Sequence, residues 1–118
     1  SLPMKINTKK LGMAGEQLAA QELQKNGYRI LERNYRKRTG EIDLIAQKDG
    51  IIYFIEVKAK NDTRFSPPAD NVNAKKRQHI ANTANWWFAE HGECDSSFLI
   101  AEVDLATKTV VLIENFLQ

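Results

Sequence analysis

The sequence predicts a single α/β domain of the mixed α+β type, with helices flanking a five-stranded sheet in the order α-β-β-β-α-β-β. Its 118 residues are a common length for one domain, and 42% hydrophobic with 27% charged residues is the usual mixture of a globular fold. Stretches with helical spacing of apolar residues alternate with short runs rich in β-branched and aromatic residues. One domain over residues 1–118 is therefore expected, with residues 1–7 flexible and residues 1–3 a remnant of cloning.

The first helix is expected over Thr8–Asn26, because its apolar residues recur at near-helical spacing and Gly27 provides a C-terminal stop. Glu16 flanks the apolar stripe of this helix rather than lying opposite it, so its carboxylate can reach inward. A strand over Tyr28–Glu32 follows, and then a basic stretch, Arg33–Arg38.

The next two strands, Glu41–Lys48 and Ile51–Ala59, are joined by Asp49 and Gly50, and this dipeptide is the strongest short signal for a hairpin. The second strand is rich in β-branched and aromatic residues, which is typical of a central strand. Alternation in the first strand places Ile42, Leu44 and Ala46 on one face and Glu41, Asp43, Ile45 and Gln47 on the other.

The second half of the chain completes the fold. Residues 60–71 are expected to form a loop, because they contain two adjacent prolines together with Asn and Asp. A second helix is expected over Val72–Glu90. Two closing strands follow at Ser97–Val103 and Thr109–Glu114.

The hairpin also predicts which side chains meet. A two-residue turn pairs Lys48 with Ile51, so Asp43 is expected directly opposite Glu56, with their Cβ atoms about 5 Å apart. Strand alternation places Lys58 on the same face as Glu56. Two like charges held opposite each other are destabilising, and Mg²⁺ or Mn²⁺ is the natural compensation because these ions prefer oxygen ligands. The alternative is that Glu56 and Lys58 lie on a solvent-exposed face or form a salt bridge.

These residues also carry a family resemblance. The segment Gly40-Glu-Ile-Asp43, followed by Glu56-Val-Lys58, resembles the PD-(D/E)xK nuclease signature. The chain from Gly12 onward is similar to the YraN-like family of small bacterial proteins, which in turn resembles Holliday-junction resolvases. The resemblance implies a restriction-endonuclease-like core and a metal-dependent endonuclease acting on DNA, on branched or structured forms in particular.

The resemblance further implies roles for individual residues. Asp43 and Glu56 would bind the metal, with the backbone carbonyl of Val57 as a further ligand. Glu16 resembles the helical acidic residue of resolvase-type sites, and Lys58 would position the attacking water or stabilise charge on the phosphate. In the family an arginine often stands where this chain has Lys60, which keeps the charge but loses the bidentate geometry.

The distribution of charge supports a nucleic-acid partner. Residues 1–89 contain 16 Lys and Arg against 9 Asp and Glu, a balance of +7, whereas residues 90–118 contain 1 against 6, a balance of −5. Such asymmetry in one small domain suggests a basic face for a polyanion, although a solvated surface with an acidic tail explains it equally simply. The expected phosphate contacts come from three segments around the site: Arg33, Arg36, Lys37, Arg38, Lys60, Arg64, Lys75, Lys76 and Arg77.

Two other functions remain open: a nucleic-acid-binding protein that keeps the site geometry without cleaving, and a plain protein-interaction domain. The lone Cys94 cannot form an internal disulfide, which suits the reducing cytoplasm. No apolar run approaches the roughly 18 residues that span a bilayer, so no membrane partner is expected. The analogy with junction resolvases raises a homodimer as a further expectation.

Overall fold

The computed structural model describes residues 8–61 and 74–114, which form two helices and five strands. In chain order these are α1 (Thr8–Lys25), β1 (Arg29–Lys37), β2 (Gly40–Lys48), β3 (Ile51–Lys60), α2 (Ala74–His91), β4 (Ser96–Asp104) and β5 (Thr109–Glu114). The strands form one sheet in the order β1-β2-β3-β4-β5, in which β3 and β4 are parallel and the other neighbours antiparallel. The predicted mixed α+β class and the predicted order of elements are confirmed.

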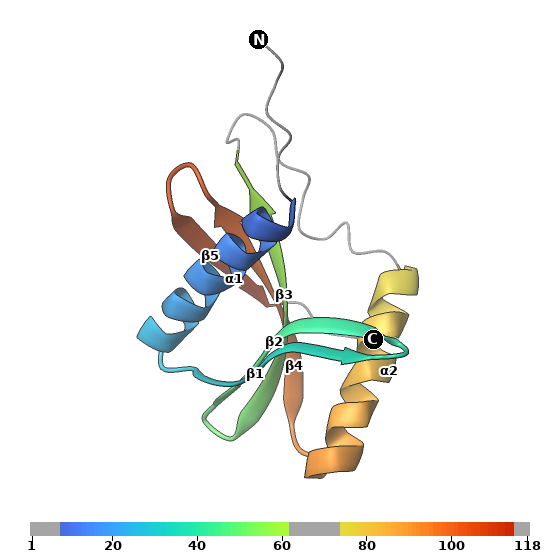
Figure 1. The fold of residues 1–118 in the computed structure, drawn as a ribbon. Helices are drawn as coiled ribbons and strands as arrows, with labels where there is room; N and C mark the ends of the chain where they lie inside the picture. Colours follow the sequence, from blue (N-terminus) through green and yellow to red (C-terminus); the bar gives the residue numbers. More distant parts are fainter. Residues whose placement is uncertain (1–7, 62–73, 115–118) are drawn as a thin grey trace.

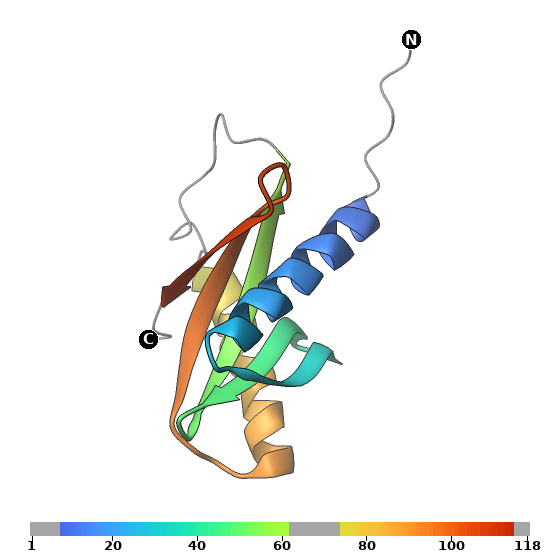
Figure 2. The same cartoon turned by 90° about the vertical axis from the view of Figure 1, so that its left-hand side faces the viewer.

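The two helices cover opposite faces of the sheet (Figure 1), and the view turned by 90° shows α1 in front of the sheet and α2 behind it (Figure 2). Leu23 of α1 packs in a core with Leu44 and Ile55. Trp87 of α2 packs in a second core with Phe54. Because β3 and β4 are parallel, the chain must cross from one end of the sheet to the other between them, and α2 is part of this crossover.

The end of α1 follows the sequence prediction closely. The helix ends at Lys25, and Gly27 adopts a φ of 88°, a left-handed conformation that glycine favours. The N–H of Gly27 donates to the carbonyl of Gln24 at 3.1 Å, and the N–H of Tyr28 donates to that of Leu23 at 2.9 Å. This pair of hydrogen bonds is a Schellman motif, so the predicted stop at Gly27 is confirmed.

Strand β1 is longer than predicted. It continues to Lys37, so most of the basic stretch that was expected after the strand belongs to it. The strand lies at one edge of the sheet, where a single neighbouring strand pairs with it and most of its side chains are exposed. Tyr35 is its one buried residue. Charged residues are common on edge strands, and here they hid the strand pattern in the sequence.

The turn between β2 and β3 confirms the predicted register. Asp49 and Gly50 have φ values of 51° and 79°, as a two-residue turn of this type requires. Lys48 pairs with Ile51, and the ladder continues in the same register up to the pair of Leu44 and Ile55. The ladder ends at this pair, so it does not include the predicted backbone pairing of Asp43 with Glu56.

The predicted alternation of β2 is wrong at one point. Ile42 packs in the core beneath α2 together with Ile45, whereas Leu44 packs in the core beneath α1. Asp43, where the faces exchange, lies across from Asn34, which has the left-handed φ of 53°. Beyond this point the β1–β2 hairpin turns away from β3 and lies against α2 (Figure 1).

Several predicted boundaries differ slightly or cannot be compared. Strand β5 has the predicted bounds, and β4 extends one residue further at each end. Lys60 ends β3 instead of beginning the loop, and residues 62–73, including the predicted helix start at Val72, lie outside the described residues, as do residues 1–7. Neither α1 nor α2, the two helices of the described residues, is long and apolar enough to cross a membrane.

Candidate functional site

A cavity of about 340 Å³ lies between the first turn of α2 and strands β2 and β3. Three carboxylates line it, those of Glu41 and Asp43 on β2 and of Glu56 on β3, together with Lys76 of α2. The complete lining consists of Glu41, Ile42, Asp43, Ile55, Glu56, Val57, Lys76, Ile80 and Phe98. The structure therefore brings together the two acidic residues that were predicted to converge, although not through a backbone pair.

Asp43 lies immediately beyond the end of the β2–β3 ladder. Its Oδ2 accepts a hydrogen bond from the backbone N–H of Val57 at 2.8 Å, so the side chain takes over where strand pairing stops. Burial raises the pKa of the Asp43 carboxyl from 3.8 to about 6, against the lowering effect of this hydrogen bond. Three nearby carboxylates raise the pKa further: those of Glu16, Glu56 and Glu41. Asp43 therefore lies in a concentration of negative charge that a cation would stabilise.

Glu56 is 8% exposed, and its two carboxylate oxygens have different surroundings. Oε1 forms an ion pair with Nζ of Lys76. Oε2 is buried and has no hydrogen-bond partner among the described residues. Leaving a buried polar atom without a partner costs about 1–3 kcal/mol, and more for a charged group. The unpaired oxygen therefore points to a ligand that the protein chain does not supply.

Glu16 approaches the same region from α1, as the sequence predicted it could. Burial raises the pKa of its carboxyl, a hydrogen bond from the side chain of Asn34 lowers it, and the charge of Glu41 raises it again. The charge of Glu16 also raises the pKa of the Asp43 carboxyl, so the two carboxylates repel each other. Asn34 was not among the site residues predicted from the sequence. The one signal in the sequence is the residue type, because Asn adopts a positive φ more readily than most residues. In the structure Asn34 has a positive φ and lies where the faces of the hairpin exchange.

Lys58 lies two residues after Glu56 on β3, which places the two side chains on the same face by strand alternation. It is half-buried, pairs along the backbone with Glu102 of β4, and does not line the cavity. Within the part of the chain that the structure describes, its ammonium forms no hydrogen bond or ion pair. Lys60, two residues further, is also half-buried and ends the strand.

The basic residues of β1 do not converge on one patch. Arg33 donates a hydrogen bond to the side chain of Gln17 on α1 at 3.3 Å. Lys37 instead forms an ion pair of 2.8 Å with Glu90, near the end of α2. Arg36 forms an ion pair of 3.2 Å with Glu41, which lines the cavity, so this arginine lies at its rim.

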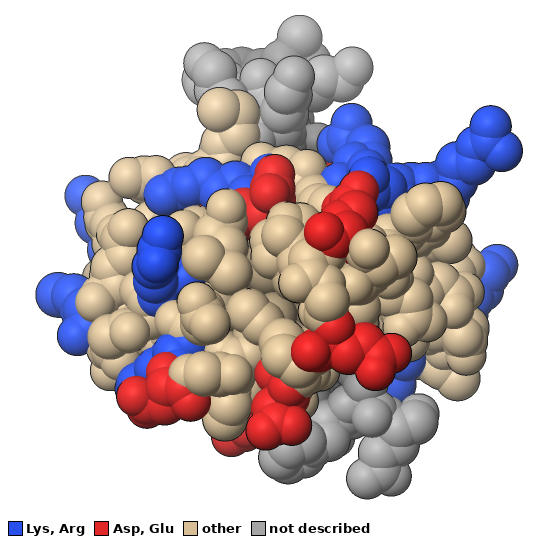
Figure 3. Space-filling view, turned by 90° about the horizontal axis from the view of Figure 1, so that it is seen from below, with Lys and Arg blue, Asp and Glu red and all other residues tan. Residues whose placement is uncertain are grey.

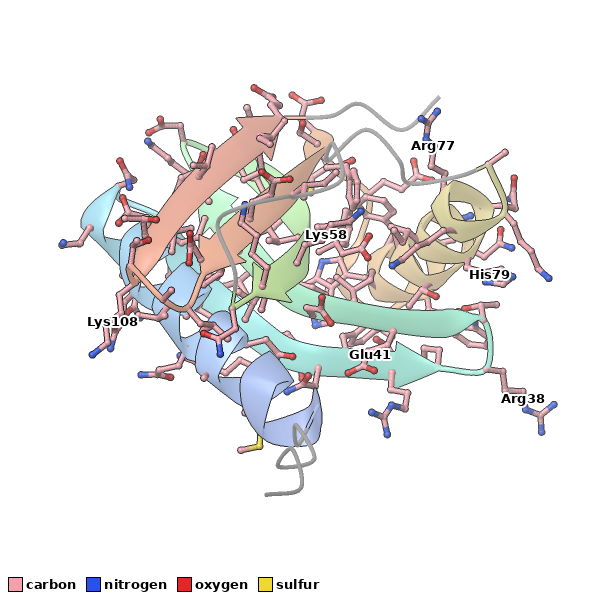
Figure 4. All side chains as sticks on the ribbon, turned by 90° about the horizontal axis from the view of Figure 1, so that it is seen from above. Arg38, Glu41, Lys58, Arg77, His79 and Lys108 are labelled. Atoms are coloured by element: carbon pink, nitrogen blue, oxygen red, sulfur yellow. The ribbon has the colours of Figure 1, made fainter. Side chains whose placement is uncertain are left out.

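The other predicted phosphate contacts lie on the hairpin turn and on α2. In the view from above, Arg38, Arg77 and His79 point outward on one side of the molecule, and Lys108 lies on the opposite side (Figure 4). Lys75 is exposed in the first turn of α2, and Arg64 lies outside the described residues. The face seen from below carries lysine, arginine and carboxylate side chains interspersed, so it is not uniformly basic (Figure 3).

The donor groups of the cavity fit a hard divalent cation. Nowhere in residues 8–61 and 74–114 are three side chains of His, Cys, Asp or Glu grouped closely enough to hold a metal ion. A site here would use the Asp43 and Glu56 carboxylates, with the backbone carbonyl of Val57 as the further ligand that the family resemblance implies. Mg²⁺ is often bound in this way, by one or two carboxylates and several waters. The buried, unpaired Oε2 of Glu56 is the observation that supports this fit.

The fold and the cavity define a class of protein: a small mixed α+β domain in which two strands and a helix bring three carboxylates and a lysine together. The chain belongs to the family described as "Uncharacterised protein family UPF0102", whose profile matches residues 15–107. The match extends from α1 to the turn after β4 and includes every cavity residue. The predicted resemblance to the YraN-like bacterial family is confirmed.

Curated relatives are similar over most of the chain. A UPF0102 protein of Caldicellulosiruptor bescii is 45% identical over 86 residues, which are 73% of this chain and 72% of that protein. A UPF0102 protein of Caldicellulosiruptor saccharolyticus is 33% identical over 115 residues, 96% of this chain and 98% of that protein. A UPF0102 protein of Geobacter metallireducens is 39% identical over 93 residues, 79% and 76% of the two chains.

Proposed function

We propose that this protein is a metal-dependent endonuclease that hydrolyses DNA phosphodiesters, with branched or structured DNA as its substrate and Mg²⁺ or Mn²⁺ as its cofactor. The observation that carries the proposal is that the Asp43 and Glu56 carboxylates line the same cavity, where a buried Glu56 oxygen has no partner among the described residues. The order of helices and strands, which matches the order expected of a restriction-endonuclease-like core, supports it.

In this proposal Asp43 and Glu56 would supply oxygen ligands for a cation, and Lys58, on the same face of β3 as Glu56, would supply an ammonium near the reacting phosphate. These two carboxylates would hold the cation, and the N–H of Val57 fixes the orientation of the Asp43 carboxylate. A bound divalent cation lowers the pKa of a water and withdraws charge from the phosphate. Lys58 has no ion pair among the described residues, so its ammonium can donate to the attacking water or to a phosphate oxygen.

Cleavage of a four-way junction and of linear duplex DNA, with Mg²⁺, with Mn²⁺ and with EDTA, tests the proposal. Asp43→Asn, Glu56→Gln and Lys58→Met are each expected to lower the rate by about 100-fold or more. Glu93→Gln and Lys108→Met remove the same charges at exposed positions away from the cavity, and they are expected to cleave at the wild-type rate.

Two results would contradict the proposal. Cleavage by the Asp43→Asn and Glu56→Gln variants at the wild-type rate would show that the activity comes from elsewhere. Folded wild-type protein that binds DNA with a strong dependence on salt, but cleaves no substrate with either cation, would favour the non-catalytic nucleic-acid-binding alternative.

A further inference from the structure

The ion pair between Lys76 and Glu56 lies inside the candidate metal site. Glu56 is almost completely buried on β3, whereas half of the Lys76 side chain is exposed at the first turn of α2. The ammonium contacts Oε1 of the same carboxylate that is proposed to bind the cation. A divalent cation bound at the unpaired Oε2 would share this carboxylate with the ammonium at Oε1, so the two positive charges would repel each other and compete for Glu56.

The place of Lys76 on α2 limits the movement of its side chain to the region around the mouth of the cavity. Ile80 is one helical turn further along α2, is buried, and lines the same cavity. The helix therefore stays in place when the Lys76 ammonium leaves Glu56, and the long, flexible side chain remains at the mouth of the cavity. Lys75, by contrast, is exposed and does not line the cavity.

We propose that Lys76 is an exchangeable cation of this site: it neutralises Glu56 until a divalent cation binds, and then moves to a phosphate oxygen of the nucleic acid. The inference rests on the proposed nuclease function and adds to it a second lysine that positions the phosphate. It also predicts reciprocal coupling, because a phosphate that attracts Lys76 away from Glu56 makes the carboxylate more accessible to the metal.

Calorimetric titration with Mn²⁺ in the absence of DNA tests the competition. Lys76→Met removes the competing ammonium, so its affinity for Mn²⁺ is expected to exceed that of the wild type by about fivefold or more. Lys75→Met removes the same charge one residue away, and its affinity is expected to change by less than about twofold, because exposed charges are screened. An affinity of Lys76→Met that is equal to or weaker than that of Lys75→Met would overturn the inference.

A second measurement uses the wild-type protein and does not depend on the folding of a variant. With ¹³C-labelled lysine, the Cε signal of Lys76 is expected to shift on saturation with Mg²⁺, whereas that of Lys75 stays in place. A Lys76 signal that does not move while the metal binds would overturn the exchange and leave the proposed metal site intact. Absence of any binding that depends on Asp43 and Glu56 would overturn the inference and the proposed function together.

Discussion

Replacing Asp43 by asparagine is expected to stabilise the folded protein at neutral and alkaline pH, although it removes a charged residue from the candidate site. The pKa of this carboxyl is raised from 3.8 to about 6, first by burial and then by the carboxylates around it. Because the folded state holds the proton more tightly than the unfolded chain, the free energy of unfolding falls as the pH rises from 3.8 to 6 and stays low above it. Each pKa unit corresponds to about 1.4 kcal/mol, so ionised Asp43 costs the folded state about 3 kcal/mol.

The asparagine side chain of the Asp43→Asn variant does not ionise, and its carbonyl oxygen can still accept the hydrogen bond from Val57. Urea denaturation in EDTA, followed by tryptophan fluorescence, is therefore expected to show Asp43→Asn about 2–3 kcal/mol more stable than the wild type at pH 8. The difference is expected to shrink towards zero as the pH falls to about 4. Asp49→Asn, which removes the same charge at the exposed turn outside the cavity, is the matched control. Two results would contradict this dependence on pH: an Asp43→Asn protein that is less stable than the wild type at pH 8, or one whose difference in stability from the wild type is the same at pH 8 and at pH 4.

Three further predictions follow from the geometry. The affinity for Mn²⁺, measured by calorimetry, is expected to rise about tenfold from pH 5 to pH 7, because Asp43 must lose its proton to bind; a flat profile would argue against Asp43 as a ligand. A Cβ on Gly15 would lie 2.7 Å from Cβ of Ala59. Gly15→Ala is therefore expected to lower the free energy of unfolding by about 1 kcal/mol in total, because this close contact costs more than the roughly 1 kcal/mol that the higher helix propensity of alanine contributes. Adding Ala59→Gly should relieve that contact, and a double-mutant cycle without coupling would contradict it. Thr83→Val is expected to destabilise the protein in urea by about 1–2 kcal/mol, because the buried Thr83 hydroxyl links α2 to Thr39 at 2.7 Å; unchanged stability would show that the link contributes nothing.

The parts of the fold that local chemistry specifies could be predicted from the sequence. Asp49 and Gly50 determine the type of turn, and the turn determines the register of the hairpin, which is why the expected pairing holds up to Leu44 and Ile55. Gly27 ends α1 for a similarly local reason. Each of these features depends on residues close together in the sequence.

The parts that depend on tertiary packing could not be predicted. The left-handed φ of Asn34 and the exchange of faces at Asp43 let the end of the β1–β2 hairpin pack against α2, and strand alternation alone gives no sign of either. The sequence therefore placed Asp43 directly opposite Glu56, whereas its carboxylate binds the Val57 N–H. Lys76 was indistinguishable from the other basic residues, because the orientation of α2 decides which of them reaches Glu56.

Anomalous diffraction from a crystal grown with Mn²⁺ is the decisive test of a metal site between Asp43 and Glu56. One strong peak is expected in the cavity, within bonding distance of the Asp43 and Glu56 carboxylates, with the Lys76 ammonium displaced from Glu56. A crystal saturated with Mn²⁺ that shows no peak there, and in which Lys76 still contacts Glu56, would contradict it.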